Sequence, residues 1–113
     1  MIKATDLRVG NLVNFYENIS LVTPEIIFAI SELEKEGKKA ISIEPIPIAE
    51  ELLIKAGAIK IGENSYNLNG MQINLTNGKW IEYVHQIELE GIHHLQNVFY
   101  FIMGKELIFE GLN

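Results

Sequence analysis

The sequence predicts an α+β fold in which a small antiparallel sheet, a β-meander joined by N-terminal strands, is packed by two or three helices. Apolar residues recur at helical spacing around residues 26–33 and 92–102. From residue 59 the apolar pattern instead alternates with a period of two, and two Asn-Gly pairs interrupt it. The 113 residues, 48% hydrophobic and 21% charged, match the size and composition of one globular domain, residues 1–113.

The first third of the chain predicts a strand followed by a helix. The apolar pairs Leu12-Val13 and Phe15-Tyr16 favour a strand within residues 11–17. Thr23 is a good N-cap and Pro24 suits the first helical position, so we expect a helix over residues 24–36 that ends at Gly37. A strand through the isoleucine-rich start of this stretch is the alternative, because β-branched residues favour strands.

A strand, a stiff connector and a short helix are expected next. Residues 40–44 return as a strand, after which Pro45 and Pro47 hold the connector in an extended conformation. A helix is predicted over residues 49–56, although Ala49 has no side chain with which to cap it.

The pair Asn69-Gly70 predicts a two-residue hairpin turn, because both positions require a positive φ. The register that this turn sets places the apolar residues of its two strands on one face: Tyr66, Leu68, Met71, Ile73 and Leu75. For Asn77-Gly78 we expect a three-residue loop with a bulge, which would align Ile81 with Leu75. The third strand of this meander would then point a further set of residues toward the core: Ile81, Tyr83, His85, Ile87 and Leu89.

The end of the chain predicts one more helix. Gly91 breaks the preceding strand, residues 92–102 carry apolar side chains at helical spacing, and Gly104 suits the position after a helix. Residues 107–109 would add a final edge strand.

Charge and composition limit the possible functions. A formal net charge of −6 with no basic cluster makes binding to double-stranded nucleic acid unfavourable. The chain lacks cysteine and a signal-peptide pattern, so we expect a cytoplasmic protein. Its longest apolar runs, residues 98–103 and 26–30, are far shorter than the roughly 20 residues that cross a bilayer. No membrane partner is therefore expected, and homo-oligomers are possible through an exposed strand edge near residues 107–109.

Neither a metal or other cofactor nor a catalytic residue is predicted. His93 and His94 are adjacent, so on a helix their side chains diverge by about 100° and do not readily share one ion. His85 would have to join them from another element, and its place in the pattern makes it a core-side histidine. Known nucleotide-binding and hydrolase motifs are absent, and no serine has a visible base partner.

The last predicted helix carries the candidate binding residues. His93, Asn97 and Tyr100 follow i, i+4, i+7 spacing and Gln96 lies beside them, which forms a polar stripe along the apolar one. Amide, imidazole and phenol groups can read a peptide backbone or a base edge. The favoured alternative is structural: the same groups would satisfy strand ends and the helix N-terminus.

Four landmarks resemble a family of small uncharacterised proteins encoded by bacteria, their phages and mobile elements. Besides the mid-chain hairpins, the landmarks are three segments: residues 7–13 (LRVGNLV), residues 44–53 (EPIPIAEELL), and residues 93–100 (HHLQNVFY) continuing to 104–107 (GKEL). The chain departs from the family pattern at Ala49, where a threonine cap is usual, at Leu53 or its neighbours, where an aromatic residue is usual, and at His94, where glutamine is usual. The resemblance implies a shared fold and a mobile-element setting, and it assigns no catalytic residue.

These observations favour a non-enzymatic protein-interaction or accessory module whose partner is an unidentified protein. The first alternative is a single-stranded nucleic-acid-binding protein that would use Trp80, Tyr83 or Phe15 as stacking platforms. The second is a small hydrolase or nucleotide-processing enzyme, which would require a cleft lined by His85 or His93 together with a carboxylate.

Overall fold

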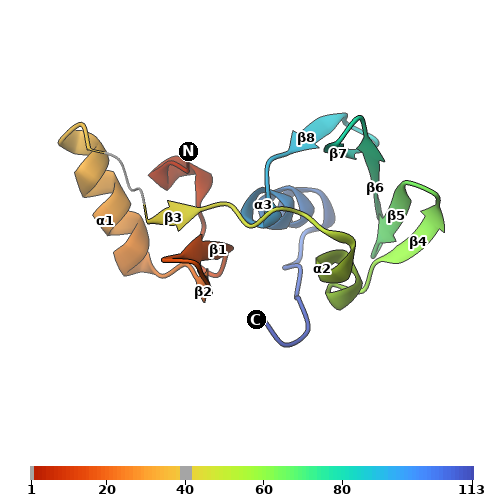
Figure 1. Ribbon diagram of the computed structural model, residues 1–113, viewed down its shortest axis with the longest axis horizontal. Helices are drawn as coiled ribbons and strands as arrows, with labels where there is room; N and C mark the ends of the chain where they lie inside the picture. Colours follow the sequence, from red (N-terminus) through yellow and green to blue (C-terminus); the bar gives the residue numbers. More distant parts are fainter. Residues whose placement is uncertain (1, 39–41) are drawn as a thin grey trace.

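The computed structural model describes residues 2–38 and 42–113, and it confirms the α+β class. Its strands form two antiparallel sheets on either side of the last helix (Figure 1). The smaller sheet has the order β2-β1-β3 and consists of β1 (Leu12–Phe15), β2 (Asn18–Leu21) and β3 (Ile43–Glu44). The larger sheet is a meander of β4 (Ile59–Gly62), β5 (Ser65–Leu68), β6 (Met71–Thr76), β7 (Lys79–Glu82) and β8 (Ile87–Leu89).

The expected helix in the first third of the chain is present as α1 (Pro24–Lys35), and the alternative of a strand in this stretch is wrong. The Thr23 hydroxyl accepts a hydrogen bond from the Ile26 amide at 3.3 Å, so the predicted cap is present. With the short 3₁₀ helix η1 (Ala4–Asp6), α1 covers one face of the smaller sheet. The core of this region consists of Ile2, Leu7, Val13, Val22, Ile30 and Ile43.

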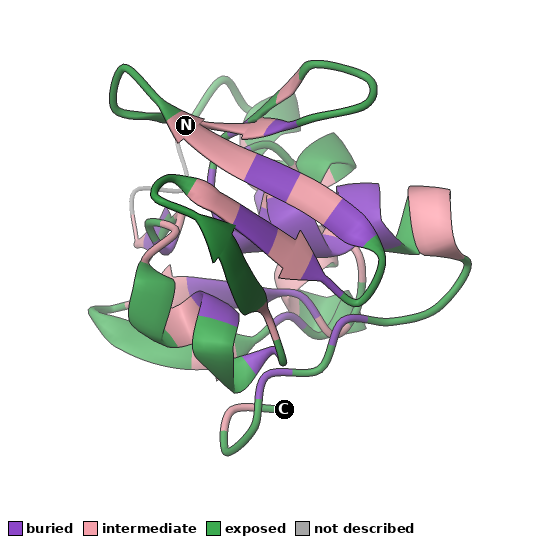
Figure 2. Ribbon diagram, turned by 90° about the vertical axis from the view of Figure 1, so that its right-hand side faces the viewer, coloured by how far each residue is buried: buried purple, intermediate pink, exposed green. Residues whose placement is uncertain are grey.

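The predicted Asn69-Gly70 hairpin is confirmed in its register. Leu68 pairs with Met71 and Tyr66 with Ile73, and these four side chains are buried. Figure 2 shows how buried and half-buried residues alternate along β5 and most of β6. The meander has five strands instead of the three expected, because β4 pairs with β5 and a turn divides the predicted last strand into β7 and β8.

The predicted bulge at Asn77-Gly78 is wrong. This turn also has two residues, so Thr76 pairs with Lys79 and Leu75 with Trp80. The register places Glu82 inside the sheet, where it is only 1% exposed, and turns Ile81 outward. The fold accepts the buried carboxylate because it is hydrogen-bonded: its oxygens accept from the Val84 amide at 2.8 Å and the His85 amide at 2.9 Å.

The predicted positions of Tyr83 and His85 are also wrong, because both lie in the turn that Glu82 stabilises. Both were expected to face the core, and both are exposed because residues 83–86 form the turn between β7 and β8. The His85 ring lies at the surface with its Nδ1 atom 3.0 Å from Glu82 Oε1.

Helix α3 (Ile92–Met103) begins and ends as predicted and lies between the two sheets (Figure 1). Gly104 ends it in the left-handed conformation, with φ 72°. At its start, a side chain on Gly91 would come within 2.9 Å of Pro45 Cβ, so glycine allows the connector after β3 to cross close to the helix. The Ile46 carbonyl accepts a hydrogen bond from the Ile92 amide at 2.9 Å in this crossing.

The last predicted strand does not form. Leu107 and Phe109 instead point into the main core from an irregular segment and are fully buried, while Ile108 is exposed. The Glu110 amide donates to the Lys55 carbonyl at 2.8 Å, so the segment is attached beside α2 (Glu50–Lys55) and is not a free sheet edge. Of the strand predicted at residues 40–44, Ile43–Glu44 is observed, and residues 39–41 lie outside the described part of the chain.

Ala49 directly precedes α2 and gives it no side-chain cap, because its methyl group cannot accept a hydrogen bond. Among residues 2–38 and 42–113, no helix combines the length and the apolar character that a membrane crossing requires.

Candidate functional site

The predicted polar stripe on α3 meets the N-terminal segment of the chain. Asn97 Oδ1 accepts hydrogen bonds from Arg8 Nε at 2.8 Å and from Asn11 Nδ2 at 2.9 Å, and Asn97 Nδ2 donates to the Asp6 carbonyl at 2.9 Å. All of the amide's hydrogen-bonding atoms therefore have partners within the chain. Asn97 holds the N-terminal segment against α3.

Gln96 holds the first strand, β1, against α3. It is 2% exposed, and its Oε1 atom accepts from the Leu12 amide at 2.7 Å while Nε2 donates to the Gly10 carbonyl at 3.4 Å. A buried strand end would otherwise leave a main-chain donor without a partner. The hydrogen bonds of Gln96 and Asn97 are of the kind that the structural alternative expects.

Tyr100 completes this contact from the outside. The Arg8 guanidinium lies 4.5 Å from the centre of the Tyr100 ring and pairs with the Glu106 carboxylate at 2.8 Å. The hydrogen bonds from Arg8 lower the pKa of Glu106 below its ordinary value. We call this group the Arg8 network: Arg8, Asn11, Gln96, Asn97, Tyr100 and Glu106. It joins residues 7–13 to residues 93–100 and 104–107, which carry two of the four resemblance landmarks.

His93, the fourth predicted site residue, lies apart from the Arg8 network. The side chain is 3% exposed, and its Nδ1 atom has no hydrogen-bond partner among the described residues. Burial lowers the pKa of His93, and the neighbouring His94 contributes in the same direction. The ring lines a cleft of about 270 Å³, which we call the His93 cleft, together with Ile2, Asp6, Pro45 and Glu90.

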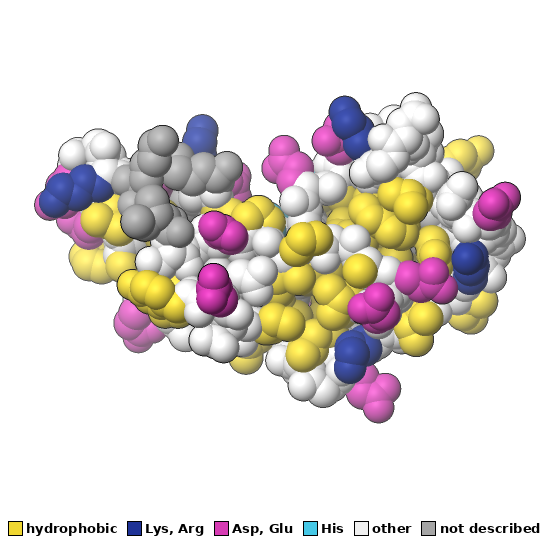
Figure 3. Space-filling view, in the orientation of Figure 1, with side chains coloured by type: hydrophobic (Ala, Val, Ile, Leu, Met, Phe, Trp, Pro, Cys, Tyr) yellow, Lys and Arg dark blue, Asp and Glu magenta, His cyan; other side chains and the backbone are white. Residues whose placement is uncertain are grey.

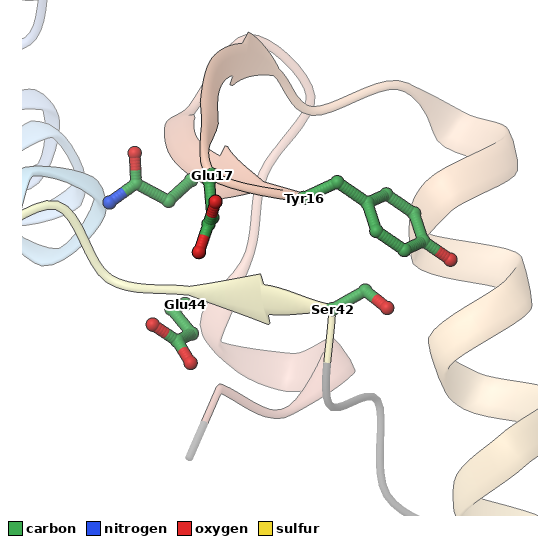
Figure 4. Close-up of a pocket in the computed structure, with 5 residues that line it drawn as sticks. Tyr16, Glu17, Ser42 and Glu44 are labelled. Carbon is green, nitrogen blue, oxygen red and sulfur yellow. The ribbon is translucent and has the colours of Figure 1, made fainter.

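A larger pocket, of about 490 Å³, lies on the smaller sheet and was not foreseen from the sequence. We call it the β3 pocket. It is lined by Asn14, Tyr16, Glu17, Ser42 and Glu44 (Figure 4). The Glu17 side chain extends from the β1–β2 turn toward β3, where Glu44 lies, and the Tyr16 ring points away toward α1. Among the described residues, neither glutamate has a partner in an ion pair.

An unusual turn shapes this pocket. Tyr16 and Glu17 form the two-residue hairpin turn with φ values of 50° and 66°, a conformation that Asn and Gly adopt far more readily. The Tyr16 amide donates to the Ser42 carbonyl at 2.9 Å, which fixes the turn over β3. Tyr-Glu is not a recognised hairpin signal, so the sequence offered no reason to place these residues together.

Exposed apolar side chains continue the same sheet face. Ile19 pairs with Asn14 and Leu21 with Leu12, so both lie on the face that carries the β3 pocket. They are 47% and 46% exposed, on a strand that forms the edge of the sheet. We call Ile19, Leu21 and the β3 pocket together the β1–β3 face. In the space-filling view, acidic and hydrophobic side chains lie next to each other in this region (Figure 3).

The residues considered for base stacking or catalysis are less suited to these roles than the β1–β3 face is to binding. The Trp80 indole donates to the Ile48 carbonyl at 3.1 Å and packs beside Tyr66. Phe15 packs against the core under α1. Of the three stacking candidates, only Tyr83 is therefore exposed. The His93 cleft does contain carboxylates, but no serine or threonine is among the described residues that line it. In residues 2–38 and 42–113, no three His, Asp or Glu side chains are grouped so that they could hold a metal ion.

Comparisons of the chain with protein-family models, curated proteins and solved structures find no match.

Proposed function

We propose that the protein is a non-enzymatic interaction module that binds a basic segment of a partner protein on its β1–β3 face. The observation that carries this proposal is the combination on one sheet face of two exposed apolar residues, Ile19 and Leu21, with the carboxylates of Glu17 and Glu44. Exposed apolar side chains next to carboxylates that have no ion-pair partner among the described residues are typical of a surface that a partner covers.

The partner follows from the chemistry of this face. A lysine or arginine side chain that enters the β3 pocket would form charge-assisted hydrogen bonds with Glu17 and Glu44. Neighbouring apolar side chains of the same segment would cover Ile19 and Leu21. The net charge of −6 would speed the approach of a basic partner and repel acidic ones.

The biological setting belongs to the same proposal. The resemblance to small proteins of bacteria, phages and mobile elements supports an accessory role in such an element, with a host or phage protein as the partner. The nucleic-acid-binding alternative is less supported, because two of the three stacking residues pack against the cores. For the hydrolase alternative, His93 does lie in a cleft with Asp6 and Glu90, but no serine or threonine is among the described residues that line it.

Affinity capture with charge-matched variants tests the proposal. Tagged wild-type protein is incubated with nuclease-treated lysate of the native host, and retained proteins are quantified. The test variant is Glu17→Lys with Glu44→Lys. The control is Glu63→Lys with Glu110→Lys, which changes net charge equally at exposed positions outside the β1–β3 face.

We expect a basic protein to be retained by the wild type and by the control variant and to be lost from the test variant. The retained protein is then purified and its binding to the three forms is measured directly, with Leu21→Ser as a further variant of the apolar part. Equal retention by both double variants, or no retention above background by the wild type, would contradict the proposal.

A further inference from the structure

Strand β2 forms an edge of the smaller sheet, and the register of its hairpin determines which of its main-chain groups face outward. The two residues that flank the turn form a hydrogen-bonded pair, and every second pair along the hairpin does the same. The Val22 amide donates to the Asn11 carbonyl at 2.8 Å, which agrees with this alternation. The N–H and C=O groups of Ile19 and Leu21 therefore point away from β1.

These outward groups lie at an open edge. Among the described residues, the main-chain groups of Ile19 and Leu21 have no hydrogen-bond partner. The side chains of the same two residues are about half exposed. Two donors and two acceptors next to two exposed apolar side chains form a template to which another strand can be added.

The other edges of the two sheets carry features that hinder such an addition, whereas β2 does not. On β4 the register shifts between Lys60 and Gly62, and Lys60 places a charge in the strand. The edge strand β8 contains Glu88, and the edge strand β3 contains Glu44. Charged side chains and irregular registers both oppose edge-to-edge pairing. In contrast, β2 is uncharged and regular over all four of its pairs with β1.

A second copy of the chain fits this edge, because β2 is complementary to itself in the antiparallel orientation. With a two-fold axis at Ser20, Ile19 of each copy lies opposite Leu21 of the other. Both pairs then exchange two main-chain hydrogen bonds, so every outward group of both copies obtains a partner. The four apolar side chains become neighbours on one face, and no like charges are opposed. We propose that the protein forms a homodimer in which two β2 strands pair antiparallel about Ser20.

The homodimer goes beyond the proposed partner binding and is compatible with it. Pairing at the strand edge joins the two smaller sheets into one, so their β1–β3 faces become one surface. The apolar residues lie at its centre, with one β3 pocket on each side. Failure of the homodimer and failure of partner binding are distinguishable, because the homodimer is measured on the purified chain without any partner.

Analytical ultracentrifugation over a range of protein concentrations measures the homodimer. We expect the mass of the wild type to rise from one chain to two chains with concentration. Ile19→Lys and Leu21→Glu, each at an exposed position, should stay monomeric. Ile61→Lys makes the same change at an exposed isoleucine of the edge strand β4 and should dimerise like the wild type. Circular dichroism verifies that each variant is folded.

Mixing of the variants tests the register. A heterodimer of Ile19→Lys with Leu21→Glu places a lysine opposite a glutamate in one pair and keeps the apolar contact in the other. This mixture should therefore recover the mass of two chains. Ile19→Lys mixed with Ile19→Glu brings together the same charges at positions that are not opposite each other, so it should recover less dimer.

Amide hydrogen exchange of the wild type provides a measurement that needs no variant. Where about nine tenths of the chains are dimeric, the amides of Ile19 and Leu21 should exchange about tenfold more slowly than in the monomer. The Ser20 amide, which faces β1, should change much less. A wild type that stays monomeric, or a dimer that Ile19→Lys leaves intact, would overturn the proposal. A monomer whose outward amides become protected only by a bound partner would assign this edge to a strand of that partner instead.

Discussion

Gln96 joins the two halves of the molecule through a single buried amide. Its Oε1 atom accepts the Leu12 main-chain hydrogen at 2.7 Å, and no water reaches this point because the side chain is 2% exposed. Gln96→Ala leaves that donor buried without a partner, which should lower the free energy of unfolding by about 2 kcal/mol.

Urea unfolding followed by circular dichroism measures this loss. Gln72→Ala is the matched control, since Gln72 is a half-exposed amide on the outer face of β6 that bonds Asn74. We expect the control to change stability by less than about 0.5 kcal/mol. Equal effects of both substitutions would show that the Gln96 amide has no special structural role.

His93 should make stability depend on pH. Burial lowers its pKa in the folded protein below the ordinary value of 6.5, so between these two values the unfolded chain binds more protons than the folded one. This contribution to stability is complete above the unfolded pKa and is lost as the pH falls through the folded pKa. Urea unfolding between about pH 8 and pH 5 should show the loss.

His93→Gln removes the titrating group from this site, so its stability should depend less on pH over the same range. Gln72→Ala, which changes no titrating group, should keep the wild-type dependence. A wild-type pH dependence that persists unchanged in His93→Gln would show that another group causes it.

At the scale of single residues, the sequence could identify the polar stripe on α3 but not its partners. Gln96 and Asn97 were recognisable because amides beside an apolar helix face are uncommon and must be satisfied. Their partners Arg8 and Asn11 lie more than 80 residues away, and no local rule connects such positions. His93 was grouped with them by helical spacing, but the crossing of Pro45 over Gly91 places it in a different environment.

At the scale of elements, the β1–β2 turn combines backbone strain with a candidate binding role. Tyr16 and Glu17 both have positive φ, which costs about 1 kcal/mol for each such residue. Replacing the pair by Asn-Gly should therefore raise the free energy of unfolding by about 1–2 kcal/mol while removing one carboxylate from the β3 pocket.

Urea unfolding and partner capture with the same variant test both parts of this expectation. The Asn-Gly variant should be more stable than the wild type and should retain less of the basic partner. A variant that is less stable would show that contacts of Tyr16 or Glu17 outweigh the strain of their backbone. Glu17→Gln, which keeps the turn residues nearly unchanged, separates the loss of charge from the change of backbone.

The β7–β8 turn explains why the register of the Asn69-Gly70 hairpin could be predicted and that of the Asn77-Gly78 hairpin could not. The Asn69-Gly70 register followed from apolar residues that agree on both strands, whereas the true register at Asn77-Gly78 buries Glu82. Sequence patterns treat a carboxylate as exposed, because they do not include the Val84 and His85 amides that satisfy it. Helix ends were predicted well, since Thr23, Pro24 and Gly104 act on residues next to them in the chain.

Glu82→Ala tests this explanation. It leaves two turn amides without their acceptor and creates a space inside the sheet, so stability should fall by about 2 kcal/mol. Amide hydrogen exchange at Val84 and His85 should become faster. Glu88→Ala, on the outer face of β8, is the control and should have little effect on stability or on exchange at these amides. Unchanged exchange at Val84 would show that the turn is held by other contacts.

At the scale of the whole molecule, two clusters of buried residues lie on either side of the smaller sheet. The larger cluster joins α2, α3, the five-stranded meander and the C-terminal segment, and the smaller one lies between α1, η1 and the other face of β1. Leu12 belongs to the larger cluster and the adjacent Val13 to the smaller one. The smaller sheet is therefore attached to the rest by β1 and by the Arg8 network, on an elongated body of 46 × 28 × 26 Å.

Such an arrangement predicts unequal local stability, because regions with less buried apolar surface open at lower free energy. In native-state hydrogen exchange, amides of α1 and β2 should exchange faster than amides of β5, β6 and α3. Added denaturant should first expose the α1 region and only later the meander. The β1–β3 face lies in the less stable region, so binding of a basic partner should slow exchange in β2 more than in β6. Uniform exchange across both regions would mean that the Arg8 network and Leu12 couple the two clusters into one cooperative unit.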